Sequence, residues 1–301
     1  MTPSVLIAQI TDLHIKRPGE KAYGIVDTAA ALSACVAHLN AFDVPLDLVV
    51  ISGDLVDTGT PEEYAHLKRL LAPLKWPIAV LPGNHDARDP MRQAFADQAY
   101  AEPSGALNQK VDVRELEIIL LDSSVPDAPH GLLGTPTLAW LDSVLAASTS
   151  RPALIFLHHP PFLTGIWHMD QQNLRNADAM AEIVRRHPRT RLVAAGHVHR
   201  STLTSFAGIP ATICPAPNHA VALDLGRKNV PAFSVEPPAF HLHVWFSGAA
   251  AGDLVTHLVP IGRFDGPHPF FGDDGKLLRS DWKRPTPGKN QKCPGGDPGH
   301  F

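Results

Sequence analysis

The sequence predicts an α/β fold, a four-layer α/β/β/α sandwich in which two sheets lie between outer helices. Short apolar runs rich in β-branched residues alternate with helix-like stretches as far as residue 196. This pattern is typical of β/α units around a buried sheet. Three strand-like runs, over residues 209–214, 240–246 and 254–261, then follow one another without helices. We expect these late strands to form a second, antiparallel sheet.

The apolar runs of the first part are continuous rather than alternating, as in strands that are covered on both faces. The expected strands cover residues 5–10, 46–51, 77–81, 117–123, 153–159 and 191–196. The expected helices cover residues 28–39, 61–74, 91–100, 135–147 and 176–187.

Length and composition indicate one catalytic domain. The chain has 301 residues, of which 44% are apolar and 19% are charged, so it is long enough to bury a substantial core. We expect this domain to cover residues 1–262. Residues 263–301 are rich in Gly, Pro and charge, and we expect an extension there that docks partly through Phe264, Phe270, Phe271 and Trp282 and is mobile at its end.

The charge pattern argues against polymeric anionic partners. The formal net charge is −4 and there is no block of Lys and Arg, so neither a nucleic-acid polymer nor a membrane surface is an expected partner. No apolar run is long enough to cross a bilayer. The cysteines Cys35, Cys214 and Cys293 are odd in number and lack C-x-x-C spacing, so we expect free thiols in a reducing cytoplasm.

Polar side chains follow five of the expected strands directly. The clusters are Asp12 and His14, then Asp54, then Asn84, His85 and Asp86, then His158 and His159, and then His197 and His199. The carboxyl ends of strands in open α/β sheets are where ligands bind. Carboxylate, amide and imidazole donors in this number exceed the needs of one four-coordinate ion and suit two ions that share a ligand.

Five sequence blocks carry a family resemblance. In order they are D-x-H, G-D-x-x-D, G-N-H-D, a single H and G-H-x-H, and together they resemble the calcineurin-like metallophosphoesterases. The stretches HHPPFLTGIWHMD, NADAMAEIV and GPHPF are similar to those of class III cyclic-nucleotide and glycerophosphodiester phosphodiesterases, over residues 5–270. The resemblance implies a sandwich with two mixed sheets and hydrolysis of small phosphodiesters by a metal-bound hydroxide.

The resemblance also implies a ligand set for two divalent ions. Asp12, His14 and His199 would hold one ion, Asn84, His158 and His197 the other, and Asp54 would bridge them. Two dications that lie close together need an anion between them, which Asp54 supplies. The thiolate-free donor set leaves Mn, Fe, Zn and Co open.

His85 is the expected catalytic residue beside this centre. By the resemblance it donates to a phosphate oxygen or protonates the leaving alkoxide, and Asp86 orients it. The candidate substrate-binding residues are Asn84, His85, Met169, Asp170 and His219. The loop that bears Met169 and Asp170 forms either a wall of the substrate pocket or a packing contact.

Several alternatives stay open from the sequence. Either ring of the pair His158 and His159 can be the ligand, although the family pattern favours His158. His241 and His243 alternate on a strand, where we expect solvent exposure or hydrogen bonding rather than a second metal pair. The activity could also be that of a phosphomonoesterase, or the fold a metal-free binding scaffold. Self-association into a dimer or larger homo-oligomer is an open expectation.

Overall fold

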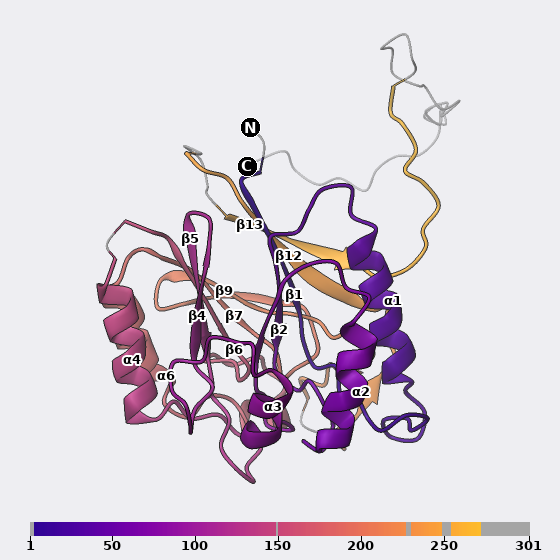
Figure 1. Cartoon of the computed structure of the whole chain (residues 1–301), viewed down its shortest axis with the longest axis horizontal. Coiled ribbons are helices and arrows are strands. Elements are labelled where there is room, and N and C mark those ends of the chain that lie inside the picture. The colour runs from indigo at the N-terminus through magenta and orange to yellow at the C-terminus, as the bar shows by residue number, and fades with distance from the viewer. Residues whose placement is uncertain (1–2, 149, 227–229, 249–253, 272–301) are drawn as a thin grey trace, which may run out of the picture. The chain divides into compact units, whose positions relative to one another are not determined.

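Two mixed sheets lie at the centre of the chain's first unit (Figure 1). The first sheet has the order β13-β12-β1-β2-β3, and the second has the order β4-β5-β6-β7-β9-β8. The first comprises β1 (Val5–Ile10), β2 (Leu48–Ser52), β3 (Ile78–Leu81), β12 (Ala239–Trp245) and β13 (Leu254–Pro260). The second comprises β4 (Gln109–Val113), β5 (Leu116–Leu121), β6 (Ala153–Leu157), β7 (Thr190–Ala195), β8 (Thr202–Phe206) and β9 (Ile209–Ile213). A separate pair joins β10 (Ala220–Val221) to β11 (Phe233–Ser234).

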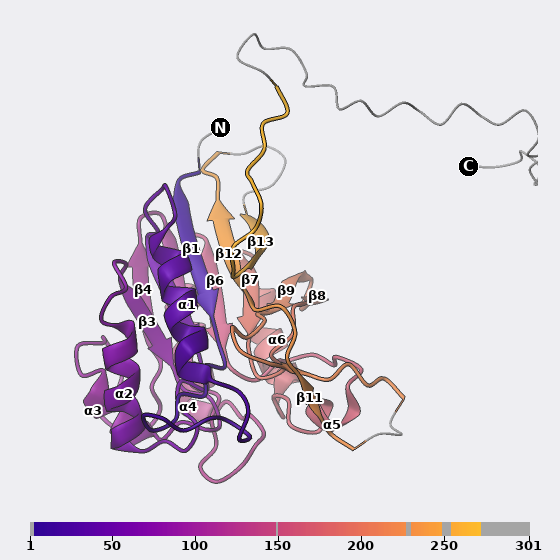
Figure 2. The same ribbon diagram turned by 90° about the vertical axis from the view of Figure 1, so that its right-hand side faces the viewer.

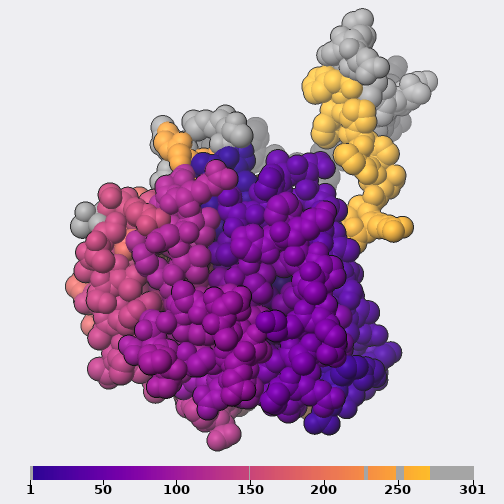
Figure 3. Space-filling view, viewed as in Figure 1, coloured from indigo at the N-terminus to yellow at the C-terminus, as the bar shows by residue number. Residues whose placement is uncertain are grey.

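Helices cover the outer faces of both sheets. Helices α1 (Thr28–Asn40), α2 (Pro61–Leu71) and α3 (Arg88–Ala94) pack on the first sheet, and α4 (Thr135–Ala146) and α6 (Ala177–Arg186) pack on the second (Figures 1 and 2). The four-residue helix α5 (Trp167–Asp170) lies in the loop after β6. In the space-filling view, the purple N-terminal part and the pink segment around α4 lie side by side on this face (Figure 3).

Three hydrophobic clusters correspond to the three interfaces of this four-layer sandwich. One joins the first sheet to α1, α2 and α3, and another joins the second sheet to α4 and α6. The third lies between the sheets, where Ile7 and Val50 of the first meet Phe156 of the second. Because side chains alternate along a strand, Ile7 faces the other sheet while its neighbour Ala8 belongs to the cluster under the helices. The predicted fold class is confirmed.

The late strands differ from the prediction, because they do not form a sheet of their own. β12 pairs antiparallel with β1, whose other neighbour is β2, and β13 continues that edge. β9 instead pairs parallel with β7 in the second sheet. The absence of intervening helices does not determine which sheet a strand joins. Which sheet a strand joins depends on which edge is free when it arrives.

Local sequence accounts for most element boundaries. α2 begins with a capping box in which the hydroxyl of Thr60 accepts from the amide of Glu63, and the Glu63 carboxylate accepts from the amide of Thr60. α3 begins earlier than predicted, since Pro90 lies in its first turn, where no amide donor is required. β4 and β8 were not predicted. They are the two edges of the second sheet and keep polar, partly exposed residues.

The computed structural model describes residues 3–148, 150–226, 230–248 and 254–271. Contacts divide the chain into two units, Met1–Gly262 and Arg263–Phe301. In the described part of the second unit, Phe264, Phe270 and Phe271 are exposed, and docking of this extension stays a prediction. Trp282 and Cys293 lie outside the described residues, whereas Cys35 and Cys214 are buried free thiols. Across the described ranges, the helices are all too short or too polar to cross a bilayer.

Candidate metal centre

The carboxyl ends of five strands bring the seven predicted donors together. β1 leads into Asp12 and His14, β2 into Asp54, and β3 into the loop of Asn84. β6 leads into His158, and β7 leads into His197 and His199. Six of these side chains are buried, and Asn84 is partly buried. The first sheet therefore supplies both carboxylates, and the second sheet supplies three imidazoles.

One group of donors comprises Asp12, His14 and His199. Their potential ligand atoms all lie within 4.8 Å of one another. Nε2 of His14 is 3.3 Å from Nε2 of His199, which in turn is 3.3 Å from Oδ1 of Asp12. Two imidazoles and a carboxylate at such distances could hold one divalent ion.

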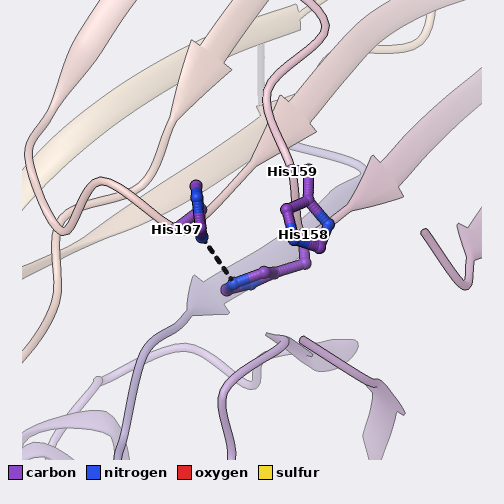
Figure 4. A group of neighbouring side chains, drawn as sticks. All are labelled: His158, His159 and His197. Carbon is purple, nitrogen blue, oxygen red and sulfur yellow. Dashed lines mark hydrogen bonds between the residues drawn. The ribbon is translucent and has the colours of Figure 1, made fainter. Parts of the chain in front are cut away.

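A second group surrounds His158. Nε2 of His158 is 3.2 Å from Nδ1 of His197 (Figure 4). The same Nε2 is 3.3 Å from Oδ2 of Asp54. The same Oδ2 of Asp54 is 3.6 Å from Nε2 of His14. Asp54 thus lies between the two groups, at the position that a bridging carboxylate needs.

Hydrogen bonds fix the tautomers of two of these rings. Nδ1 of His158 donates to the carbonyl oxygen of Ser52 at 3.0 Å, and Nδ1 of His199 donates to the carbonyl oxygen of His219 at 3.3 Å. In the neutral rings, Nε2 then carries a lone pair directed toward other nitrogens and carboxylate oxygens. The buried Oδ1 of Asn84 has no hydrogen-bond partner among the described residues. Converging lone pairs of this kind fit divalent cations.

The electrostatics of the cluster keep its carboxylates anionic. Burial by itself raises the pKa of Asp12, but His199 and His158 outweigh it and lower this pKa to about 2. Burial likewise opposes ionisation of Asp54, yet His158 and His85 hold its pKa well below the usual range. Burial and the neighbouring His159 keep the pKa of His197 well below its ordinary value, so this ring stays neutral and able to donate a lone pair.

The backbone at the centre is strained. Five of the seven predicted donors have a left-handed backbone, with φ of 54° at Asp12, 45° at His14, 49° at Asp54, 72° at His197 and 56° at His199. Asp and His tolerate this conformation better than most residues, at a cost of about 1–3 kcal/mol each. The strain aims consecutive side chains into one place, and such outliers are typical of functional sites.

A glycine next to Asp54 allows the two sheets to approach closely. Gly53 has φ of 97°, and a Cβ atom there would lie 2.3 Å from Nδ1 of His158. Any side chain at this position would displace the His158 ring from its place. Gly53 therefore has two roles. It allows the left-handed backbone conformation, and it leaves space for the ring of His158, a predicted ligand from the other sheet.

His85 lies beside the cluster, and its orientation differs from the prediction. Its Nδ1 is 2.7 Å from the carbonyl oxygen of Asp57, and no hydrogen bond joins its ring to Asp86. Asp86 accepts instead from the amides of Gly83 and Leu55 and from the hydroxyl of Tyr64. Burial and Asp54 raise the pKa of Asp86 to about 6. Asp86 shapes the loop, because its carboxylate accepts from two backbone amides and a tyrosine hydroxyl.

Asp57 supports the centre from outside. Its Oδ1 is 3.4 Å from Nδ1 of His14, and its Oδ2 forms an ion pair with Nζ of Lys16 at 2.6 Å. Asp57 therefore acts as an acceptor that orients its neighbours.

The histidine pair separates into two environments (Figure 4). His158 faces Asp54, whereas Nδ1 of His159 is bonded to the hydroxyl of Ser123 at 2.8 Å. His159 nevertheless forms a possible three-histidine group with His158 and His197. The contact with Asp54 favours His158 as the ligand.

Four of the five candidate substrate-binding residues line a cavity, and one does not. Met169, His219, Asn84 and His85 all line one cavity that reaches the metal centre. Asp170 is not among the residues that line it, and contact of this residue with the substrate stays a prediction. Its carboxylate accepts from the amide and hydroxyl of Thr164 and from the amide of Gly165, so it closes the loop before α5.

His241 and His243 are buried in β12 rather than exposed to solvent. Nε2 of His241 contacts the hydroxyl of Ser201 at 3.0 Å, and Nδ1 of His243 contacts the hydroxyl of Thr256 at 2.8 Å. The hydrogen-bonded interpretation holds for both. The described residues place neither in a group of metal donors.

Sequence reasoning missed the aromatic residues near the centre. Tyr23 and Phe233 line the cavity beside His219. Tyr23 stands before Gly24, a turn signal, but nothing in the sequence indicates that this turn faces the strand ends. Phe233 is part of the two-residue strand β11, which is too short to be recognised.

The sequence is similar to those of proteins named as phosphodiesterases. A probable glycerophosphodiester phosphodiesterase of Arcobacter nitrofigilis is 36% identical over 275 residues, which cover 91% of this chain and 100% of the relative. A cAMP/cGMP dual specificity phosphodiesterase of Mycobacterium tuberculosis is 32% identical over 266 residues, covering 86% of this chain and 80% of the relative.

Solved structures with a similar fold are also found. A dimetal phosphatase from Danio rerio superposes with a TM-score of 0.60 at 14% identity, covering 87% of this chain and all of that chain. At this identity the match shows the fold alone. Residues 5–201 match the calcineurin-like phosphoesterase family, and with the relatives above this shows that the chain belongs to that family.

Proposed function

We propose that this protein is a metal-dependent phosphodiesterase that hydrolyses small phosphodiesters, namely 3′,5′-cyclic nucleotides or glycerophosphodiesters. The observation that carries the proposal is the position of Asp54 between two groups of converging donors. The relatives named as phosphodiesterases support the same substrate class.

The proposed cofactor is a pair of divalent ions, chosen from Mn, Fe, Zn and Co by availability rather than by donor preference. Asp12, His14 and His199 would hold one, Asn84, His158 and His197 the other, and Asp54 would contact both. When bound, such a pair polarises the phosphoryl group and lowers the pKa of water toward neutrality. The donor set described above fits this role, since it combines two anions with the neutral imidazole of His197.

His85 supplies the proton that hydrolysis requires. Water adds to phosphorus, one P–O ester bond breaks, and the leaving alkoxide takes a proton. Burial lowers the pKa of His85, but Asp54 and the Asp57 carbonyl oxygen raise it above its ordinary value, which favours the ring form that donates. With Nδ1 held by Asp57, Nε2 is left to face the substrate.

Three features of the proposal concern the protein's location and partners. We propose a cytoplasmic location, consistent with the buried free thiols Cys35 and Cys214. We also propose that the partner is a small molecule rather than a nucleic-acid polymer, and that the protein can form a homo-oligomer. Size-exclusion chromatography with light scattering tests the last of these.

The function is tested by comparing substrates. The protein is purified with Mn²⁺, and turnover is measured for 3′,5′-cAMP, 2′,3′-cAMP, glycerophosphocholine and p-nitrophenyl phosphate, with metal content determined in the same sample. We expect hydrolysis of at least one diester that exceeds hydrolysis of the monoester. Inactivity on all three diesters overturns the proposal. Activity only on the monoester identifies a phosphomonoesterase, and well under two metal equivalents after reconstitution identifies a scaffold.

A further inference from the structure

Two cavities meet at Asn84 and His85, and their linings differ. One, of about 250 Å³, reaches His14, Asp54 and His197 and is also lined by Tyr23 and Phe233. The other, of about 640 Å³, extends past Arg88 and Asp127. Apart from the shared His85 ring, no aromatic side chain is among the residues that line the larger cavity. The aromatic surface is therefore confined to the cavity that contains the proposed metal ligands.

Tyr23 occupies a backbone position that tyrosine rarely adopts. It lies at the tip of a small hairpin in which Ala22 and Val26 exchange two backbone hydrogen bonds of 2.9 Å each. Tyr23 has φ of 51° and Gly24 has φ of 73°, so both central residues of the turn are left-handed. Asn, Asp and Gly favour such a turn. A tyrosine at this place is explained by what its ring contacts rather than by the turn.

The Tyr23 ring forms one wall with Phe233, a residue far away in the sequence. Their ring centroids are 4.6 Å apart and their planes differ by 28°, so the rings stack. The His219 ring stands edge-on to both, at 5.4 Å from Tyr23 and 5.3 Å from Phe233. His219 also lies 4.5 Å from the His199 ring. An aromatic surface thus runs from a proposed metal ligand outward to Tyr23, which is 60% exposed.

We infer that the stacked pair of Tyr23 and Phe233 determines substrate specificity, because the outer face of the pair stacks against a planar ring of the diester, so that the favoured substrate is a nucleoside cyclic phosphate. This inference rests on the proposed phosphodiesterase function. A stacked pair offers a flat face, which suits a base, whereas a quaternary ammonium is held by rings that surround it. Gln172 lines the same cavity, and its amide offers both a donor and an acceptor to the edge of a base.

The inference is tested with two substrates that differ in aromatic character. KM and kcat are measured for 3′,5′-cAMP and for glycerophosphocholine with wild type, Tyr23→Ala, Phe233→Ala and Tyr23→Phe. We expect both alanine variants to raise KM for cAMP by about 5- to 150-fold, the range for loss of one stacking contact. KM for glycerophosphocholine should rise far less, and Tyr23→Phe should restore KM for cAMP because it keeps the ring.

A binding measurement separates this inference from the proposed function. AMP affinity of the metal-loaded protein is measured by calorimetry, with Leu203→Ala as the control, since Leu203 is an exposed apolar residue of β8 outside both cavities. We expect Tyr23→Ala to weaken AMP binding and Leu203→Ala to leave it unchanged. Equal effects of Tyr23→Ala on both substrates, or unchanged AMP affinity, overturn the inference while the phosphodiesterase function stands. A wild type that hydrolyses no diester refutes the function instead, and AMP binding still tests the stacking surface.

Discussion

The two sheets contribute different chemistry to the same centre. The first sheet supplies Asp12 and Asp54, the anionic members of the predicted set, whereas the second sheet supplies His158, His197 and His199. The two contributions are linked by hydrogen bonds across the interface. The amide of His197 donates to the Asp12 carboxylate, and Nδ1 of His158 donates to the carbonyl oxygen of Ser52.

This division has a physical consequence. The first sheet adds the two carboxylates, whose pKa values the neighbouring histidines lower, and the second sheet adds the neutral ring of His197. Loss of an anionic donor should therefore cost more than loss of a neutral one. Because donors come from both sheets, a bound ion should also hold the sheets together.

The largest expected effect is that of Asp54→Ala. Removal of the shared carboxylate leaves two close dications without an anion between them. We expect metal content to fall below one equivalent and diester turnover to fall by more than about 10⁴-fold, beyond the effect of a single acid–base group. His197→Ala, which removes a neutral donor, should retain one ion. The exposed Asp43→Ala is the control, and unchanged occupancy in Asp54→Ala contradicts the bridging role.

The second effect concerns His85, which contacts both cavities without belonging to the predicted ligand set. His85→Ala should lower kcat by about 10²–10⁴-fold while metal content is retained, because only proton donation is lost. Metal analysis by mass spectrometry accompanies the kinetics. A parallel loss of metal would show that His85 acts as a ligand instead.

A smaller effect on metal affinity is expected from a change at Asp57, which follows β2 of the first sheet but is not one of the predicted ligands. Asp57→Asn keeps the shape of the side chain but removes the charge that faces Nδ1 of His14. Loss of such a supporting partner typically costs about 10–100-fold in metal affinity or activity. Competition with a metal indicator measures the affinity. Lys16→Met is the comparison variant, since Lys16 pairs with Asp57 but not with His14. An Asp57→Asn protein with wild-type metal affinity would refute the supporting role.

The smallest effect is on stability. Metal at ten times its Kd stabilises the folded state by about 1.4 kcal/mol, which corresponds to about 3–6 °C in Tm for a domain of this size. Calorimetry before and after chelation measures the shift. Hydrogen exchange should show loosening at the ends of both β2 and β6 after chelation, and loosening at only one of them would argue against a link between the sheets.

Local patterns predicted much of the site. The donor types after each strand follow from short motifs. The structure brings six of the seven side chains together, and Asn84 lines the adjoining cavity. The contacts of Asp86 and Asp170 were not predictable, because a carboxylate in a loop can face either a ligand or a backbone amide. Three-dimensional packing assigns both to backbone amides.

The sequence by itself determined the alternation of strands and helices and the chemical identity of the donors at the strand ends. Both are encoded over a few residues, by apolar runs and by the polar residues that terminate them. Only the tertiary structure decided which sheet β12 joins, which ring of the His158–His159 pair faces Asp54, and that Tyr23 stacks on Phe233. These outcomes depend on free sheet edges and on contacts between segments distant in sequence, and no local pattern records them.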